Sequence, residues 1–267
     1  MTTIAAAPVR IPRATAKPIP LSRITAVELR KMFDTRSGFW LIASIAITAL
    51  LATGAVVLFA ANDELTYATF VSAIGIPMAI LLPLVAILSV TSEWSQRTGL
   101  TTFTLVPHRS RIITAKTVCS VIVGVVSILL AFAIGALGNV LNGAVTGTNL
   151  VWDVTLNEAL YFVLGNVLGL LIGFMLGILI RASSGAIAAY FIYSFVLPGI
   201  FIVLATNQNW FKDLQPWVDV TFAQAPLLTF DGALTGEQWA HIGVTGLIWL
   251  VIPMAFGLWF VMRAEVK

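Results

Sequence analysis

Long apolar stretches set the pattern of this sequence. Six of them contain no Asp, Glu, Lys or Arg and are long enough to cross a bilayer, which takes about 20 mostly apolar residues. They cover residues 38–61, 70–90, 117–137, 159–180, 185–205 and 241–262. Because lipid offers the backbone no hydrogen-bond partner, each stretch is expected to be helical. The predicted fold is an all-α polytopic membrane protein in which residues 21–267 form a single transmembrane domain.

The composition supports this class of protein. The 267 residues are 59% hydrophobic and only 10% charged, whereas a soluble domain carries about 25% charged residues. The single cysteine, Cys119, excludes an intrachain disulfide.

The charges between the apolar stretches predict an orientation. With the N-terminus inside, every Lys and Arg except Lys212 falls in a cytoplasmic segment. The outer segments instead carry most of the acids, which are Asp63, Glu64, Asp153, Glu158, Asp213, Asp219, Asp231 and Glu237. The positive-inside rule therefore favours a multi-pass protein of the cell (inner or plasma) membrane, with both termini in the cytoplasm.

The N-terminal region divides into two parts. Residues 1–20 are rich in Pro, Ala and Arg, so we expect a disordered cytoplasmic tail. Residues 21–37 mix apolar and basic residues, which predicts an amphipathic elbow helix along the inner leaflet; an ordinary solvated helix is the alternative. A basic segment beside apolar spans indicates attraction to the bilayer rather than to nucleic acid.

The outer loop, residues 206–240, is too apolar for a free loop. It contains Trp210, Phe211, Trp217 and Phe222. We expect it to pack at the outer membrane face or dip into the membrane; a belt of aromatic residues anchoring helix ends is the alternative.

Catalytic and cofactor signatures are missing from the sequence. It has no HExxH, GxSxG or Cys/His cluster, so neither an enzyme nor a metal site is predicted. It also lacks a GxxxxGK[ST] phosphate loop, and no Asp, Glu, Lys or Arg lies in the core of a span. If the chain moves a solute, the free energy must come from a gradient or from a partner.

The fourth stretch carries glycines at every fourth position: Gly165, Gly169, Gly173 and Gly177. This spacing places them on one helix face and predicts close helix packing, either within the chain or with a second copy. Four prolines interrupt other stretches: Pro77, Pro83, Pro198 and Pro253. Kinks that act as hinges and prolines that are merely tolerated are equally compatible with this pattern.

The segment after the second stretch, residues 91–116, is the most informative. Glu93 stands at the membrane boundary, a short helix is expected over about Trp94–Val106, and Pro107 precedes a basic run. A simple positive-inside loop explains the basic residues but not Glu93, nor a connector of this length.

This segment resembles the first cytoplasmic loop of type-2 ATP-binding-cassette (ABC) exporter permeases. The resemblance rests on an E-x-x-x-x-T-G pattern followed by P-x-R-x-R and a lysine: Glu93, Thr98, Gly99, Pro107, Arg109, Arg111 and Lys116. Residues 28–40 also resemble that family's elbow helix, and six spans with a long final outer loop fit as well.

The resemblance implies a membrane-spanning subunit that works in efflux. Two permease subunits, identical or related, would pair with two separate ATPase subunits that bind ATP and Mg²⁺. The residues implied in coupling to the ATPase are Glu93, Trp94, Arg97, Thr98, Pro107, Arg109 and Arg111. The alternative is a membrane anchor, assembly or immunity protein that transports nothing.

Overall fold

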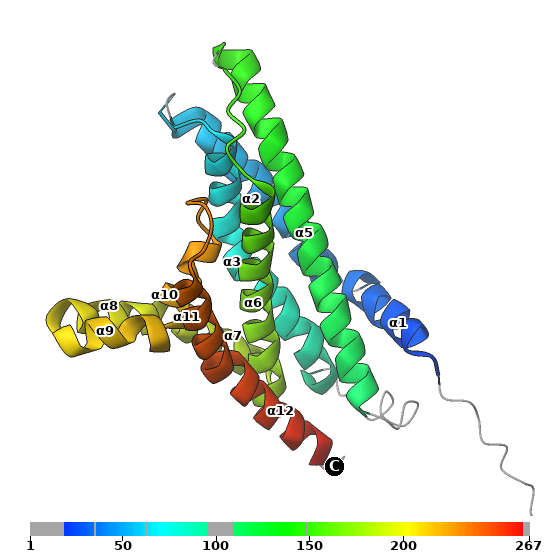
Figure 1. The fold of residues 1–267 in the computed structure, drawn as a ribbon. Helices are drawn as coiled ribbons and strands as arrows, with labels where there is room; N and C mark the ends of the chain where they lie inside the picture. Colours follow the sequence, from blue (N-terminus) through cyan, green and yellow to red (C-terminus); the bar gives the residue numbers. More distant parts are fainter. Residues whose placement is uncertain (1–18, 35, 62–63, 96–108, 148, 264–267) are drawn as a thin grey trace, which may run out of the picture.

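The computed structural model describes residues 19–34, 36–61, 64–95, 109–147 and 149–263, and in these residues it is helical, without strands (Figure 1). The elements are α1 (Leu21–Asp34), α2 (Arg36–Phe59), α3 (Tyr67–Ser95), α5 (Arg109–Thr146), α6 (Leu156–Ile180), α7 (Ser183–Phe191), η1 (Ile192–Val196), α8 (Leu197–Asn207), α9 (Asn209–Val218), α10 (Val220–Gln224), η2 (Ala225–Leu227), α11 (Gly236–Gly246), η3 (Leu247–Val251) and α12 (Ile252–Arg263).

Six helical stretches of the described residues are long and apolar enough to cross a membrane, as predicted. Two of them are composite, α7–η1–α8 and α11–η3–α12. The third is longer than predicted, because α5 has 38 residues and at 1.5 Å per residue reaches about 57 Å. The extra turns mix polar and apolar residues on either side of the predicted span, and no proline after Pro107 interrupts the helix there.

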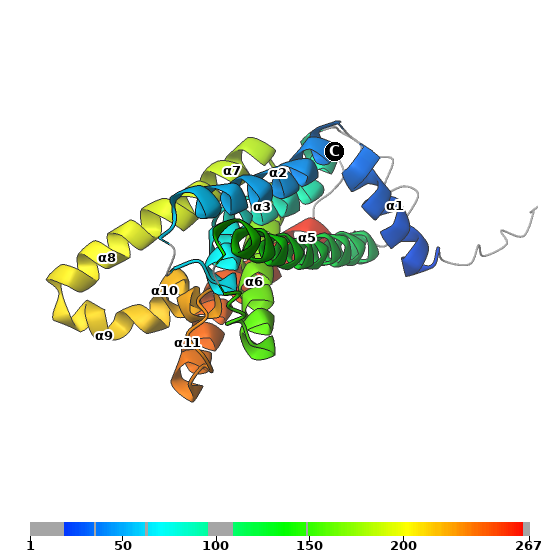
Figure 2. The ribbon, with the colours of Figure 1, turned by 90° about the horizontal axis from the view of Figure 1, so that it is seen from above.

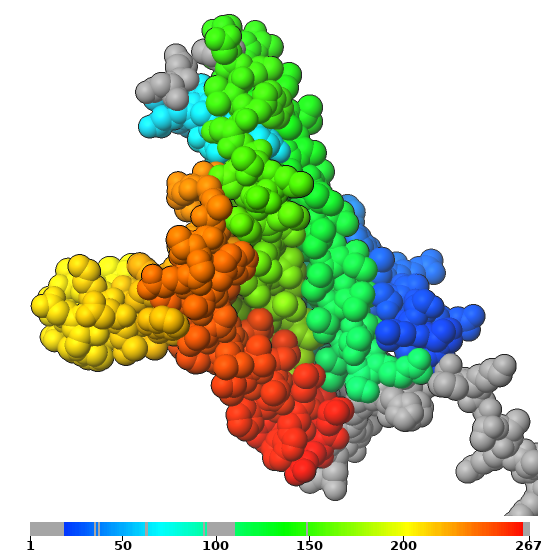
Figure 3. Space-filling model, in the orientation of Figure 1, coloured from blue at the N-terminus to red at the C-terminus, as the bar shows by residue number. Residues whose placement is uncertain are grey.

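Helices α2, α3, α5 and α6 form the packed part of the bundle and alternate in direction (Figure 1). In the most apolar 18-residue segment of α6, half of the residues are buried. In the corresponding segments of α7–η1–α8 and α11–η3–α12, only 6% and 17% of the residues are buried. The last two spans therefore present their apolar side chains to the surroundings. Figure 3 shows α8 and α9 standing out from the bundle as an arm.

Three of the four glycines on α6 meet another part of the chain closely. A Cβ on Gly173 would lie 2.6 Å from the carbonyl oxygen of Pro83, and one on Gly177 would lie 3.3 Å from Val90, both on α3. A Cβ on Gly165 would lie 2.8 Å from Leu228. A Cβ on Gly169 would meet no atom of the described residues within 4 Å, so close packing of Gly169, which the sequence also allowed against a second copy, stays a prediction.

The four prolines act in two ways. Pro77 and Pro83 lie inside the continuous helix α3. Pro83 has no N–H to donate to the Ala79 carbonyl, which instead accepts a hydrogen bond from the Tyr190 hydroxyl. Pro198 and Pro253 each follow a five-residue π-helical turn, η1 or η3, that ends two residues before the proline. A π-turn beside a proline accommodates the hydrogen bond that the proline cannot donate. Prolines and π-turns are both known causes of helix bending.

The outer loop is folded, as its apolar character predicted. Helix α9 returns along α8 (Figure 2), with the rings of Phe201 and Phe211 5.6 Å apart. The indole Nε1 of Trp249 donates to the Val218 carbonyl at 2.7 Å, which ties the end of α9 to η3. Whether this region lies at the membrane face or dips into it stays a prediction.

At this end of the bundle several acids serve as helix caps. Glu158 completes a capping box with Thr155 and also accepts from the Gly232 N–H at 2.9 Å. Asp153 accepts from the Ala68 N–H at 2.8 Å, at the start of α3. These carboxylates therefore hold the connections between helices in place, besides contributing negative charge.

We predict that Gly173→Leu lowers the free energy of unfolding in detergent by about 1–3 kcal/mol, because the side chain would collide with the backbone of α3. Gly169→Leu is the matched control, on the same helix with open space at its Cβ, and should change stability much less. Equal losses in the two variants would contradict this account of the α3–α6 contact.

Candidate functional site

The connector between α3 and α5 is the segment that the sequence singled out. Helix α3 continues to Ser95 and α5 begins at Arg109, so the predicted loop of residues 91–116 is helical at both of its ends. The predicted boundaries of the second and third spans were therefore too narrow, since residues 91–93 and 109–116 are helical, and the helix expected from about Trp94 is continuous with α3 at Trp94 and Ser95. The polar residues that follow the second span contain no helix breaker, so α3 continues past the apolar run.

The predicted coupling residues are only partly within the described residues. Glu93 belongs to the last turn of α3 and Arg109 begins α5. Arg97, Thr98, Pro107 and the expected helix of about Trp94–Val106 beyond Ser95 lie outside the described residues. The coupling role of these residues therefore stays a prediction.

Trp94 and Arg111 lie close to the bundle at the two ends of the connector. The indole of Trp94 is half-buried against the core and, with Ile112, Ile113 and Lys116 of α5, lines a narrow cavity that α6 closes. Arg111 is half-buried in the first turn of α5. Both ends of the connector are thus packed on the same region of the bundle.

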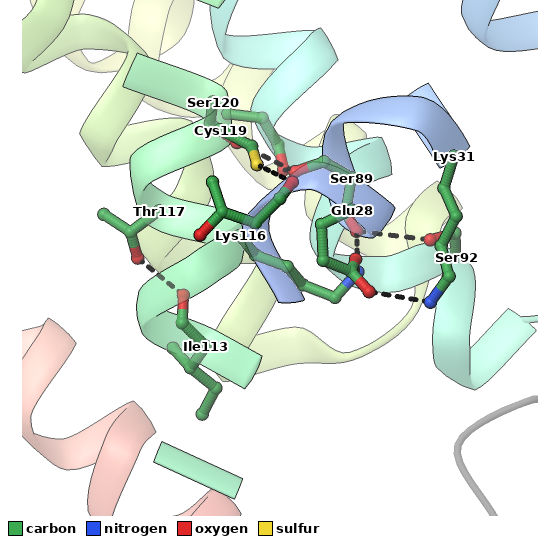
Figure 4. Close-up of polar contacts among 11 residues, drawn as sticks. Glu28, Lys31, Ser89, Ser92, Ile113, Lys116, Thr117, Cys119 and Ser120 are labelled. Carbon is green, nitrogen blue, oxygen red and sulfur yellow. Dashed lines mark hydrogen bonds and ion pairs between the residues drawn. The ribbon is translucent and has the colours of Figure 1, made fainter. Parts of the chain in front are cut away.

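A buried ion pair lies just beneath the connector (Figure 4). Lys116 Nζ of α5 donates to Glu28 Oε2 of α1 at 2.6 Å and to the Ser89 carbonyl of α3 at 3.0 Å. The two charged side chains are only 7% and 5% exposed. We call Glu28, Ser89 and Lys116, together with the neighbouring Cys119 and Ser120, the basal junction.

Glu28 is stabilised as a carboxylate. Burial alone would raise the pKa of Glu28, but the charge of Lys116 and the hydrogen bonds from Lys116 and Lys31 outweigh it and lower the pKa below its usual value. Lys31 Nζ lies 2.7 Å from Glu28 Oε1, one helical turn further along α1. Because this one acid faces two lysines, Glu28 stays a carboxylate at neutral pH.

Neutral hydrogen bonds extend the basal junction to the other helices. The hydroxyls of Ser89 and Ser120 lie 3.0 Å apart, and Cys119 Sγ donates to the Thr25 carbonyl at 3.2 Å. Nearer the connector, the Thr91 hydroxyl lies 2.7 Å from that of Ser183, at the start of α7. Helices α1, α3, α5 and α7 are therefore tied together at the base of the connector.

The chemistry of this site is that of a mechanical anchor. None of the described residues forms a group of three His, Cys, Asp or Glu that could hold a metal ion. The carboxylate of Glu28 is engaged by two lysines, and the thiol of Cys119 is buried and hydrogen-bonded. This arrangement fixes the positions of helices; it offers no open nucleophile to a substrate.

The sequence interpretation treated Glu28 and Lys116 only as parts of motifs. Two signals pointed to their pairing. Glu28 lies on the same helical face as Ile24 and Met32, which pack on the bundle, and Lys116 is the last charge before a long apolar run. A charge in either place needs a partner.

Comparison with protein-family models finds no match to this chain, and comparison with curated proteins finds no significant match.

We predict that Glu28→Gln destabilises the protein by about 3 kcal/mol, because it leaves the buried Lys116 ammonium without a counter-charge. The matched control is Glu237→Gln, which removes a carboxylate that is 77% exposed and 3.9 Å from His241, and should cost less than about 1 kcal/mol. The double variant Glu28→Leu/Lys116→Met should recover most of the loss, since neither charge is then buried. Equal stability of Glu28→Gln and wild type would contradict the anchoring role.

We also predict that the basal junction loses its strength in acid. A carboxylate whose pKa is lower in the folded than in the unfolded chain stabilises the fold above its unfolded pKa, and this stabilisation is lost as the pH falls through the folded value. Unfolding in detergent, measured from about pH 7 to pH 3, should therefore show a steeper loss of stability below about pH 5 in wild type than in Glu28→Gln. Parallel curves would show that Glu28 does not contribute.

Proposed function

We propose that this chain is the membrane-spanning permease subunit of an ABC exporter in the cell membrane, with both termini in the cytoplasm. The observation that carries the proposal is the basal junction, which fixes both ends of the connector to the bundle. A force on residues 96–108 would act directly on the ends of α3 and α5, and would pass from α3 to α7 through Thr91 and Ser183 and from α5 to α1 through Lys116 and Glu28.

The need for an external motor follows from the chemistry of the chain. The cores of the predicted spans have no Asp, Glu, Lys or Arg, and the sequence has no phosphate loop. The proposed complex supplies that motor as two ATPase subunits, which bind ATP and Mg²⁺ and dock on the connector. A second permease subunit, identical or related, completes the pathway. Switching between inward and outward access would then be a movement of packed helices driven from one end.

The first test is purification of the chain from its native membrane under mild detergent. We expect a subunit with ATPase activity to accompany it in equal amount, and Arg97→Glu to weaken that association. Recovery of the chain without any ATPase subunit would reject the proposal and favour a membrane anchor or immunity protein.

The second test concerns coupling. In the purified complex we expect Glu93→Ala to lower the ATPase activity severalfold relative to wild type while thermal stability in detergent stays unchanged. Glu64→Ala removes an exposed acid next to the first residues of α3, at the other end of that helix, and serves as the control. Wild-type ATPase activity in the Glu93→Ala complex would contradict the coupling role.

A further inference from the structure

Helix α1 has two different faces. Ile24 and Glu28 are buried against the bundle, and Leu29 and Met32 pack on its core. The opposite face is exposed and carries Arg23, Val27 and Arg30 at positions i, i+4 and i+7, which lie in one row on a helix. Val27 is 51% exposed, and Phe33, near the end of the same helix, is 47% exposed.

The exposed face is basic because the basal junction removes an acid from it. Glu28 points into the bundle, where Lys116 and Lys31 bind it. On the outside of α1 and the first turn of α2, three arginines remain, Arg23, Arg30 and Arg36, against the single acid Asp34. None of these arginines forms an ion pair with a residue that the structure describes.

This face lies where a bilayer would place its phosphates. Lys116 lies just before the predicted third span, and its ammonium donates both to Glu28 and to the Ser89 carbonyl at the end of the second span. Helix α2 becomes apolar from Gly38. In Figures 1 and 2, α1 lies beside α5 at the edge of the bundle, so other helices do not cover its outer face. The polar headgroup regions add about 10–15 Å in total to the roughly 30 Å hydrocarbon core, so a helix at the span ends lies among headgroups.

We infer that the outer face of α1 is a binding surface for anionic phospholipids. Arg23, Arg30 and Arg36 would pair with lipid phosphates, for which the guanidinium fork is suited, while Val27 and Phe33 would contact the acyl chains. Glu28 fixes the roll of the helix and so directs the arginines outward. The inference does not depend on the proposed transport function.

The test uses the purified full-length chain in detergent, with phosphatidylglycerol or phosphatidylcholine added and bound lipid measured by native mass spectrometry. We expect wild type to prefer phosphatidylglycerol, with binding that weakens as salt rises. The triple variant Arg23→Gln/Arg30→Gln/Arg36→Gln should lose at least about tenfold in phosphatidylglycerol affinity, given about fivefold for each charge. Equal binding of the two lipids, no salt effect in wild type, or a triple variant that binds like wild type would each overturn the inference.

Two controls separate lipid recognition from other effects. Lys212→Gln removes one basic residue elsewhere and should leave phosphatidylglycerol affinity unchanged, and the triple Arg→Lys variant should retain most of it. Soluble glycerol phosphate should not compete at concentrations where the lipid is bound. Full competition by it would indicate a site for a free phosphate and would overturn the assignment to lipid. If the triple Gln variant fails to fold, the salt series and the triple Lys variant still decide the question.

Discussion

The Lys116–Glu28 ion pair is the interaction on which the arrangement of this end of the bundle depends. Two opposite charges, each more than nine-tenths buried, lie 2.6 Å apart although the two residues are 88 positions apart in the chain. An ammonium at the edge of an apolar helix bundle is costly unless it is paired and hydrogen-bonded, and the Ser89 carbonyl supplies the additional acceptor. The pair therefore fixes α1 on α5 and, through Ser89, sets the distance of both to α3.

The bundle has one part in which the helices are closely packed and another in which little of the helix surface is buried. In the closely packed part, glycine allows the backbones of α3 and α6 to approach closely, and Tyr190 satisfies the carbonyl that Pro83 leaves free. The last two spans instead contain π-turns next to prolines and bury little of their surface. Pro198 and Pro253 thus lie beside π-turns in spans with little buried surface, whereas Pro77 and Pro83 lie in the packed helix α3. The proposed second permease subunit would find its free apolar surface here, on α7–η1–α8.

The amino-acid pattern was sufficient to predict the number of spans and their approximate positions. In lipid the backbone must form its hydrogen bonds within the segment, so an apolar span is helical, and the thickness of the bilayer sets its length. Helix ends were less predictable. Polar residues such as Thr91 and Ser92 continue α3 because nothing in them breaks a helix. The glycine row predicted close packing, but no local pattern says which part of the chain packs on it; Gly173 and Gly177 meet α3, Gly165 meets Leu228, and Gly169 meets neither. The sequence indicates that Glu28 and Lys116 each need a partner, but only tertiary packing shows that they pair with each other.

The position of the basal junction also bears on how a movement could enter the bundle. The connector leaves α3 at Ser95 and returns at Arg109, and within two turns of each end lies a polar contact to a different helix: Thr91 to Ser183 on one side, Lys116 to Glu28 on the other. A displacement of the connector therefore cannot shift α3 alone. A shift of α3 alone would break the hydrogen bonds of Thr91 to Ser183 and of Ser89 to Lys116, and a shift of α5 away from α1 would break a buried ion pair, which costs several kcal/mol. A concerted movement of one end of the bundle is the cheaper response, and this is the property that a helix connector needs if it is to transmit work from outside the membrane.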